Sequence, residues 1–233
     1  MSFNKVLVLI QARMGSTRFP KKMMAELHGM PMIEWVLRRC GSANQIDQVV
    51  LATSDLQRDD VLADHAEICG FDVYRGNEAD VLGRFAKAAE QYNADIIVRV
   101  CGDRPLVAAE AIDAAVTFFD KNDVDLAFNH IPEGGQNWPM GFGCEVLSAQ
   151  LLFEMSNNQQ DEYYREHVTS YMWKHSENFK LIPTPFDFDI CHSNILRFDV
   201  DTKQDLALLN QMSGLTINSS IQDILDVYFA QIN

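Results

Sequence analysis

Four cations and a run of small residues follow the first strongly apolar segment of the chain. Residues 6–10 form a short apolar run, which predicts a buried strand. Residues 15–17 are Gly-Ser-Thr, and the cations around them are Arg13, Arg18, Lys21 and Lys22. Flexible backbone amides together with Arg and Lys side chains suit the oxygens of a polyphosphate. Because open α/β sheets bind ligands at the carboxyl ends of parallel strands, this loop is the first candidate site.

The charge of the chain is distributed unevenly. The 233 residues carry 33 acidic and 19 basic side chains, a net charge of −14, yet residues 1–40 alone carry +5. A cationic segment on an acidic protein indicates a local anion site, unless these are ordinary solvated surface charges. The balance argues against a long nucleic acid as partner, because such a partner needs a broad basic surface.

A second candidate follows residues 95–100, Asp-Ile-Ile-Val-Arg-Val, whose mostly apolar run predicts another buried strand. Gly102 and Asp103 come directly after this strand, where a carboxylate is well placed to hold a divalent ion over phosphates. The alternative is a turn or helix-capping aspartate, because Pro105 and a predicted helix follow.

A third candidate is the pair Asp199 and Asp201 in the segment Phe-Asp-Val-Asp-Thr. Residues two apart on a strand point to the same side, so these carboxylates are expected to project together. Two adjacent carboxylates repel unless a cation lies between them, and Mg²⁺ accepts one or two carboxylates. The alternative is that Asp201 caps the following helix and Asp199 lies on the surface.

Other polar residues follow predicted elements but carry weaker signals. Thr53 and Ser54 end a second apolar strand, where a polar turn explains them as well as a ligand contact does. Arg84 lies on a predicted helix, where it either faces a ligand or pairs with Asp80 one turn away. Cys101 is interpreted as a small buried residue.

The first candidate loop resembles the first motif of a known family, the cytidylyltransferases that activate acidic sugars, which include the acylneuraminate and ketodeoxyoctonate enzymes. The segment QARMGSTRFPKK is similar to QARMGSTRLPGK, which is typical of their bacterial branch, the spore coat polysaccharide biosynthesis protein F type. The resemblance extends from residue 5 to about residue 212. Phe19 replaces the usual Leu, and Lys21 replaces the usual Gly. The matching residues are Gln11, Arg13, Gly15, Ser16, Arg18, Pro20 and Lys22.

This resemblance implies a glycosyltransferase-A-like fold and a reaction between CTP and an acidic or modified sugar, giving a CMP-sugar and pyrophosphate. Arg13 and Lys22 are expected to hold the triphosphate, with Asp103 as the third catalytic residue. Mg²⁺ is the implied cofactor, with Asp103, Asp199 and Asp201 as its ligands. The resemblance places Thr53 and Ser54 beside the cytosine and ribose. The residues expected to bind the nucleotide are Gln11, Ala12, Gly15, Ser16, Arg18, Thr53, Ser54 and Arg84.

The acceptor half of the family motif is matched less completely. Glu145, Arg165 and His167 correspond to residues of the family's acceptor segment. His167 either contacts the acceptor or acts as a base, unless it is a structural residue of an aromatic helix. The family's Asp-Gly-Leu-Asp is replaced here by Met-Gly-Phe-Gly at residues 140–143, and this removes polar groups that could meet a sugar.

Apolar and amphipathic segments alternate through the first half of the chain, which predicts an α/β fold with a mostly parallel sheet flanked by helices. One domain is expected over residues 1–233. Its parts are a nucleotide-binding half at 1–129, an acceptor and dimer segment at 130–195, and a metal motif with C-terminal helices at 196–233. Strands are expected at 6–10, 49–53, 72–75, 95–100, 125–129, 145–147, 179–183 and 196–200. Helices are expected at 61–69, 81–92, 108–121, 161–175, from 202 and at 220–232, with a long loop at 130–143.

Composition adds expectations about location and partners. No apolar run approaches about 20 residues, so no membrane contact is expected and the protein is predicted to be cytoplasmic. Five cysteines (Cys40, Cys69, Cys101, Cys144 and Cys191) stand singly without a Cys-x-x-Cys spacing, which argues against disulfides and zinc sites. The aromatic content of residues 130–180 and the practice of the family predict a homodimer.

Two other functions stay open at this point. A metal-dependent glycosyltransferase with a nucleotide-sugar donor uses paired aspartates on the same fold, although the cationic loop suits a triphosphate better. A non-catalytic nucleotide-binding relative is the other alternative. The joint presence of both candidate phosphate cations and both candidate metal ligands argues against it.

Overall fold

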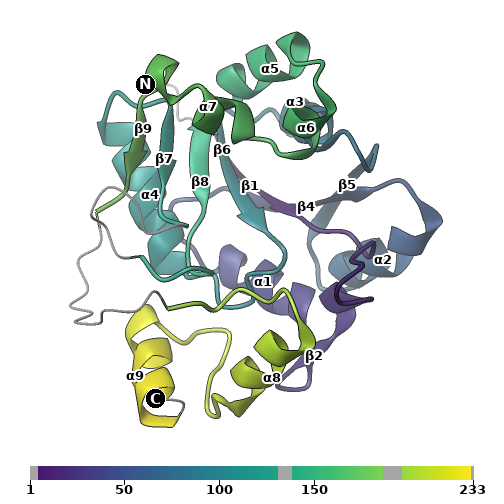
Figure 1. Cartoon of the computed structure of the whole chain (residues 1–233), viewed down its shortest axis with the longest axis vertical. Helices are drawn as coiled ribbons and strands as arrows, with labels where there is room; N and C mark the ends of the chain where they lie inside the picture. The colour runs from purple at the N-terminus through teal and green to yellow at the C-terminus, as the bar shows by residue number, and fades with distance from the viewer. Residues whose placement is uncertain (1–4, 131–137, 186–195, 232–233) are drawn as a thin grey trace.

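The computed structural model describes residues 5–130, 138–185 and 196–231, and these form one sheet flanked by helices (Figure 1). The strand order is β5-β4-β1-β6-β8-β7-β9, and four of the six neighbouring pairs are parallel because only β8 runs against both neighbours. The prediction of a single-domain α/β fold with a mostly parallel sheet is therefore confirmed. The strands are β1 Val6–Gln11, β4 Gln48–Ser54, β5 Asp72–Gly76, β6 Ile96–Cys101, β7 Leu126–Phe128, β8 Glu145–Ser148 and β9 Leu181–Pro183.

Helices pack against both faces of the central strand β1. Val8 and Ile10 belong to one buried cluster, while Leu7 and Leu9 belong to another, because successive side chains of a strand point to opposite faces. This continuous apolar run is the pattern of a strand buried on both sides. The first face is covered by α1 Met32–Gly41, α2 Asp60–Ile68 and α4 Ala109–Lys121. The second is covered by α3 Val81–Gln91, α5 Ala149–Asn158 and α7 Ser170–Lys174.

A third apolar cluster joins the C-terminal helices to the body of the protein. It includes α8 Lys203–Gln211 and α9 Ile221–Gln231, which lie beyond the sheet in Figure 1, together with the short strand β2 Glu26–Leu27. The rings of Phe142 and Phe198 stack in this cluster with centroids 4.6 Å apart. This packing brings the segment before α8 to the end of the sheet where β1 and β6 finish.

The remaining elements are short. β2 pairs with β3 Met30–Pro31 in a small antiparallel ribbon. α6 Glu162–Glu166 precedes α7. The 3-10 turns are η1 Lys22–Met24, η2 Gln57–Asp59 and η3 Ser176–Asn178.

Some elements differ from the sequence-based expectations. Helices α1 and α5 were not expected, and the single helix expected at 161–175 is divided into α6 and α7. The strand expected at 196–200 is an extended segment with a single bridge between Met140 and Arg197. Residues 131–137 of the expected loop and Cys191 lie outside the described residues.

The structure also bears on membrane-spanning helices and on the cysteines. Across residues 5–130, 138–185 and 196–231, no helix combines the length and apolar character needed to cross a membrane. The thiols of Cys40, Cys69, Cys101 and Cys144 are free.

Candidate active site

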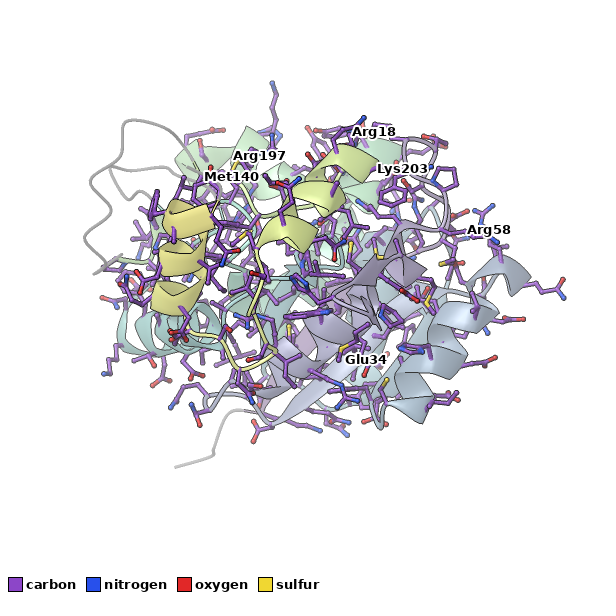
Figure 2. All side chains as sticks on the ribbon, turned by 90° about the horizontal axis from the view of Figure 1, so that it is seen from below. Arg18, Glu34, Arg58, Met140, Arg197 and Lys203 are labelled. Carbon is purple, nitrogen blue, oxygen red and sulfur yellow. The ribbon has the colours of Figure 1, made fainter. Side chains whose placement is uncertain are left out.

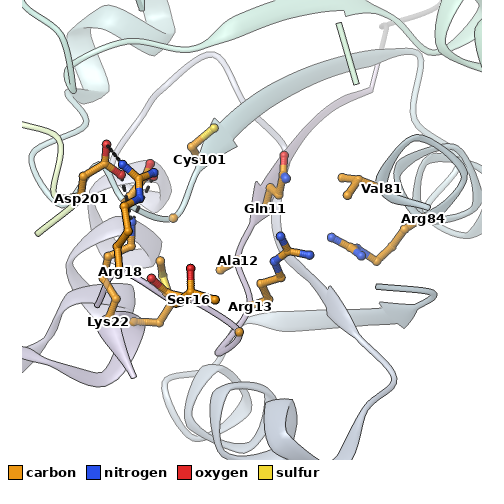
Figure 3. Close-up of a pocket in the computed structure, with 15 residues that line it drawn as sticks. Gln11, Ala12, Arg13, Ser16, Arg18, Lys22, Val81, Arg84, Cys101 and Asp201 are labelled. Carbon is orange, nitrogen blue, oxygen red and sulfur yellow. Dashed lines mark hydrogen bonds and ion pairs between the residues drawn. The ribbon is translucent and has the colours of Figure 1, made fainter. Parts of the chain in front are cut away.

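A cavity of about 280 Å³ opens at the carboxyl ends of β1 and β6, where the sequence predicted a ligand site (Figure 3). Four cations and two carboxylates line it, so its formal charge is +2 although the whole chain carries −14. Such a concentration of positive charge favours an anionic ligand. The predicted site residues that line the cavity are Gln11, Ala12, Arg13, Gly15, Ser16, Arg18, Lys22, Arg84, Asp103 and Asp201.

Lys22 connects both candidate metal-binding carboxylates. It lies in η1, and its side chain is only 8% exposed. Its Nζ donates a hydrogen bond of 2.7 Å to the carbonyl of Val200 and lies 3.3 Å from Oδ2 of Asp103 and 3.7 Å from Oδ1 of Asp201. Arg18 adds a second cation, 3.5 Å from Asp201 on the outer side. The two carboxylates therefore converge on one ammonium group, although they are 98 residues apart in sequence.

Close backbone packing holds the two carboxylate segments beside β1. The amide of Gly102 donates to the carbonyl of Gln11 at 2.8 Å. A Cβ at Gly102 would lie 2.7 Å from the Cβ of Ala12, so only glycine fits at this crossing. The amide of Val200 donates to the carbonyl of Asp103 at 2.8 Å, which fixes the segment before α8 next to the end of β6.

Two guanidinium groups point toward one another on the other side of the cavity (Figure 3). Arg84 is buried on α3 and donates to the carbonyl of Asn77 at 2.7 Å, and within the described part of the chain its Nε has no hydrogen-bond partner. Burial lowers the pKa of Arg84, and the nearby charge of Arg13 lowers it further. Arg13 itself pairs with Glu166 at 3.0 Å and lies 3.7 Å from Glu78. An anion between the two guanidinium groups would offset their repulsion.

The sequence allowed an ion pair between Asp80 and Arg84 one helical turn apart, but the structure does not contain it. The Asp80 carboxylate accepts from the amide of Gly83 and forms an ion pair of 2.7 Å with Arg165. Arg165 also donates to the carbonyls of Ser156 and Gln159, so it ties α3 to the segment between α5 and α6. It lies outside the cavity lining.

Thr53 and Ser54 are fully buried at the end of β4 and lie behind the cavity rather than on its surface. The Ser54 hydroxyl donates to Oδ2 of Asp59, and Oδ1 of Asp59 accepts from the amide of Met14 at 2.6 Å. Asp59 thus fixes the backbone of the cationic loop from behind. Sequence reasoning missed Asp59, and its only sequence signal was an acidic residue at the start of a helix, because the loop that it supports lies 45 residues earlier.

Glu145 is buried in a polar network under the sheet's end, outside the cavity lining. It accepts from Thr169 at 2.9 Å, from the Trp173 indole at 3.0 Å and from Arg99. Burial alone would raise its pKa, but Arg99 and neighbouring His130 outweigh this and lower it to about 2. The carboxylate therefore stays ionised at neutral pH.

Arg99 connects this polar network to the cavity lining by hydrogen bonds. Its second terminal nitrogen donates to the side-chain oxygen of Gln11 at 3.2 Å, and Gln11 lines the cavity. Glu145 therefore contacts the cavity lining only through Arg99 and does not face the cavity. Sequence reasoning also missed Arg99, although a charged residue inside a buried apolar strand is a recognisable signal.

Two further predicted residues lie away from the cavity. His167 is exposed, with its ring 4.7 Å from that of Tyr163. Asp199 pairs with Arg197 at 2.7 Å, and the cavity lining contains Asp201 without it. The expected side-by-side pair of Asp199 and Asp201 is absent because residues 196–200 do not form a regular strand. The structure brings Asp103 to Asp201 instead.

Comparison with known proteins shows which family this chain resembles. The family model described as Cytidylyltransferase matches residues 7–227. The chain is 34% identical to the spore coat polysaccharide biosynthesis protein SpsF of Bacillus subtilis, over 95% of this chain and 93% of that protein. It is 33% identical to the 3-deoxy-manno-octulosonate cytidylyltransferase of Chlorobium chlorochromatii, over 72% of this chain and 73% of that protein.

A solved structure agrees with these relatives. A cytidylyltransferase from Leptospira borgpetersenii has a TM-score of 0.88 and 30% identity, covering 97% of this chain and 94% of that one. The family match over residues 7–227 includes the cationic loop and both carboxylate segments. The chain belongs to the cytidylyltransferase family of nucleotidyltransferases.

Proposed function

We propose that this chain transfers CMP from CTP to a hydroxyl group of an acidic or modified sugar, for use in a surface polysaccharide or glycoconjugate. A bond forms between the sugar oxygen and the α-phosphorus of CTP, and the bond to the β-phosphate breaks to release pyrophosphate. The observation that carries this proposal is the convergence of Arg13, Lys22 and Arg84 with Asp103 and Asp201 around one cavity. A triphosphate and a divalent ion together match that combination of charges.

The cationic side of the cavity is proposed to bind the triphosphate. Arg13 and Arg84 face each other across a space that an anion can fill, and Arg84 is held in place by backbone carbonyls. Ser16 and Gly15 contribute loop backbone at the same wall. Because these groups are positioned before the ligand arrives, they stabilise charge that develops on the phosphates without further reorganisation.

The carboxylate side fits a hard divalent cation. Asp103 and Asp201 offer only oxygen ligands and are about one-third exposed, which leaves room for phosphate oxygens and water. Asp103 and Asp201 would hold Mg²⁺, which would supply charge neutralisation between the α-phosphate and the leaving pyrophosphate. Lys22 contacts both carboxylates, and its ammonium group is also proposed to contact the phosphates of the bound nucleotide. Asp199 is not proposed as a ligand, because it is engaged by Arg197.

The acceptor is proposed to approach over the side of the cavity that Gln11 and Cys101 line. Gln11 is oriented by Arg99, which is itself held by Glu145. The relative from Chlorobium is named for 3-deoxy-manno-octulosonate, which motivates an acidic sugar as substrate class. Residues 140–143 lack the family's acidic groups, so the acceptor of this chain is expected to differ in detail.

The proposal includes a cytoplasmic homodimer. Its support is the aromatic surface of α6 and α7, where Tyr163 is 60% exposed and the rings of Tyr164 and Tyr171 lie 5.3 Å apart. Sedimentation at several concentrations tests this part, and a monomer mass at every concentration would contradict it.

The experiment that tests the function begins with thermal stabilisation by CTP, UTP, ATP and GTP, each with and without Mg²⁺. A ligand that binds the folded state raises the melting temperature by mass action. We expect a magnesium-dependent shift with CTP, followed by pyrophosphate release when acidic sugars are screened as acceptors. A shift with UDP- or CMP-sugars but with no nucleoside triphosphate would instead favour a glycosyltransferase.

A further inference from the structure

Three side chains with metal-binding atoms meet between α1 and α2, away from the cavity. Glu34 lies on α1 (Figure 2), and His65 and Cys69 lie at the C-terminal end of α2. Nε2 of His65 is 2.9 Å from Oε2 of Glu34 and 3.6 Å from Sγ of Cys69, and the three atoms lie within 4.8 Å of one another. None of these residues lines the candidate active site.

The spacing of these atoms agrees with a tetrahedral site. With Zn–S bonds of about 2.3 Å and Zn–N or Zn–O bonds of about 2.0 Å, tetrahedral angles place S and N about 3.5 Å apart and N and O about 3.3 Å apart. The observed sulfur–nitrogen distance of 3.6 Å is close to the first value. The nitrogen–oxygen distance of 2.9 Å is a hydrogen bond that must open by roughly 0.4 Å to admit the ion.

The surroundings hold the ligand atoms in place. His65 and Cys69 are four residues apart, so the helix presents them on one side. Nε of Arg38 donates to Oε1 of Glu34 at 2.7 Å, which leaves Oε2 directed at His65. Hydrogen-bonded ligand carboxylates of this kind are typical of metal sites. All three ligand residues are half-buried, so water can reach a fourth coordination position.

We propose that Glu34, His65 and Cys69 form a binding site for one thiophilic divalent ion of the zinc class, which links α1 to α2. A thiolate and a carboxylate supply two negative charges to the ion, while Arg38 stays paired with the other oxygen of the same carboxylate, and the thiol proton of Cys69 leaves to solvent on binding. Mixed sulfur, nitrogen and oxygen ligands favour zinc over magnesium. The site is separate from the proposed magnesium position and does not depend on the proposed function.

This inference revises the expectation that the cysteines hold no zinc. That expectation rested on the absence of closely spaced cysteine pairs along the sequence. Glu34 precedes His65 by 31 residues, so the packing of α1 against α2 creates the cluster and no linear motif reveals it.

The test is calorimetric titration of the metal-free full-length protein with Zn²⁺, in parallel with the absorption spectrum after Co²⁺ is added. We expect one equivalent of Zn²⁺ to bind, with heats that depend on the buffer because a proton is released. Co²⁺ should give the intense visible bands of a tetrahedral site and a sulfur-to-cobalt band. The variants Cys69→Ser and His65→Gln should each weaken Zn²⁺ binding at least tenfold.

The control variant is His175→Gln, because His175 also neighbours a glutamate but belongs to no such cluster among the residues that the structure describes. It should bind Zn²⁺ like the wild type. Melting temperatures in EDTA confirm that each variant folds, and the cobalt spectrum of the wild type tests thiolate ligation without any variant. The proposal is overturned if the wild type binds no Zn²⁺, if Co²⁺ shows no sulfur band, or if Cys69→Ser and His65→Gln bind as tightly as the wild type. CTP binding is measured in a separate titration with Mg²⁺ and without Zn²⁺. A failure to bind CTP there would contradict the proposed function but not the zinc site.

Discussion

The Nζ atom of Lys22 lies 3.3 Å from the Asp103 carboxylate, although 81 residues separate them in sequence. The contact joins the cationic loop after β1 to the end of β6. Since the same ammonium also lies near Asp201, one buried cation organises three segments of the chain. This arrangement keeps two carboxylates close together before any metal or nucleotide is bound.

Arg13→Ala is expected to reduce turnover by roughly 10²- to 10³-fold, because it removes a positioned donor that stabilises charge on the phosphates. Steady-state pyrophosphate release with an identified acceptor measures the effect. Lys21→Ala is the matched control, since Lys21 is an exposed cation of the same loop that does not line the cavity. Near-normal turnover in Arg13→Ala would refute the role assigned to this residue.

Lys21→Gly is expected to stabilise the fold by about 0.5 to 1 kcal/mol. Lys21 has φ of 61° and ψ of 23°, a left-handed conformation that costs a residue with a Cβ roughly 1–2 kcal/mol, and the greater unfolded freedom of glycine offsets part of the gain. Urea denaturation measures the difference. Lys21→Ala keeps the strain and should show no gain, so equal stabilisation in both variants would point to charge removal as the cause.

His130 is expected to make the fold less stable in mild acid. Burial lowers its pKa to about 4 from 6.5, with the attraction of Glu145 opposing the shift and Arg104 and Arg99 adding to it. Between these values the unfolded chain binds a proton that the folded chain does not, so stability is full above pH 6.5 and falls as the pH drops toward 4. The slope is about 1.4 kcal/mol per pH unit, or about 2 kcal/mol between pH 6.5 and 5.

Denaturation of wild type and His130→Gln at pH 5, 6 and 7 checks this slope. The carboxyl groups with a lowered pKa, Glu145 among them, act mainly below their ordinary values near 4, so the comparison with His130→Gln separates the histidine from them. His130→Gln should show a flatter dependence, whereas His175→Gln should keep the wild-type slope. Identical slopes in wild type and His130→Gln would show that the buried imidazole does not control acid stability.

Gly102→Ala is expected to destabilise the protein by about 1–3 kcal/mol and to displace Asp103, because the new Cβ would meet the Cβ of Ala12 at 2.7 Å. Gly41→Ala is the control, since its Cβ would meet only the ring of Phe71, which can move, in a helix that favours alanine. Thermal unfolding and CTP titration of both variants measure the two effects. If both variants behave like the wild type, the close packing of β1 and β6 does not position the carboxylate.

The parallel core and the phosphate side of the site were predictable from sequence because their signals are local. Buried strands such as β1 and β6 are apolar runs that end directly in candidate residues. The helical spacing of Ile33, Val36 and Leu37 is an equally local signal, which predicts the helix α1.

The rest depends on tertiary contacts that no local pattern records. The expected helix at 161–175 breaks at His167, whose ψ of 81° is not helical, and beyond the break Thr169 donates its hydroxyl to the buried Glu145. Asp199 was expected to lie beside Asp201 on a strand. The segment instead has a single β-bridge, at Arg197, and the Asp199 side chain pairs with Arg197 rather than lining the cavity. The supporting roles of Asp59 and Arg99 likewise arise from residues that are distant in sequence.

The most direct test of the central claim is calorimetric titration of CTP with Mg²⁺ into wild type, Lys22→Met and the control Lys21→Met. Lys22→Met keeps the length and volume of the side chain but removes its charge. Charge-assisted contacts contribute about 1.5–3 kcal/mol, so its affinity should fall roughly 10- to 100-fold while Lys21→Met stays near the wild type. Equal affinity for CTP in all three proteins, or no binding of CTP by the wild type, would contradict the account.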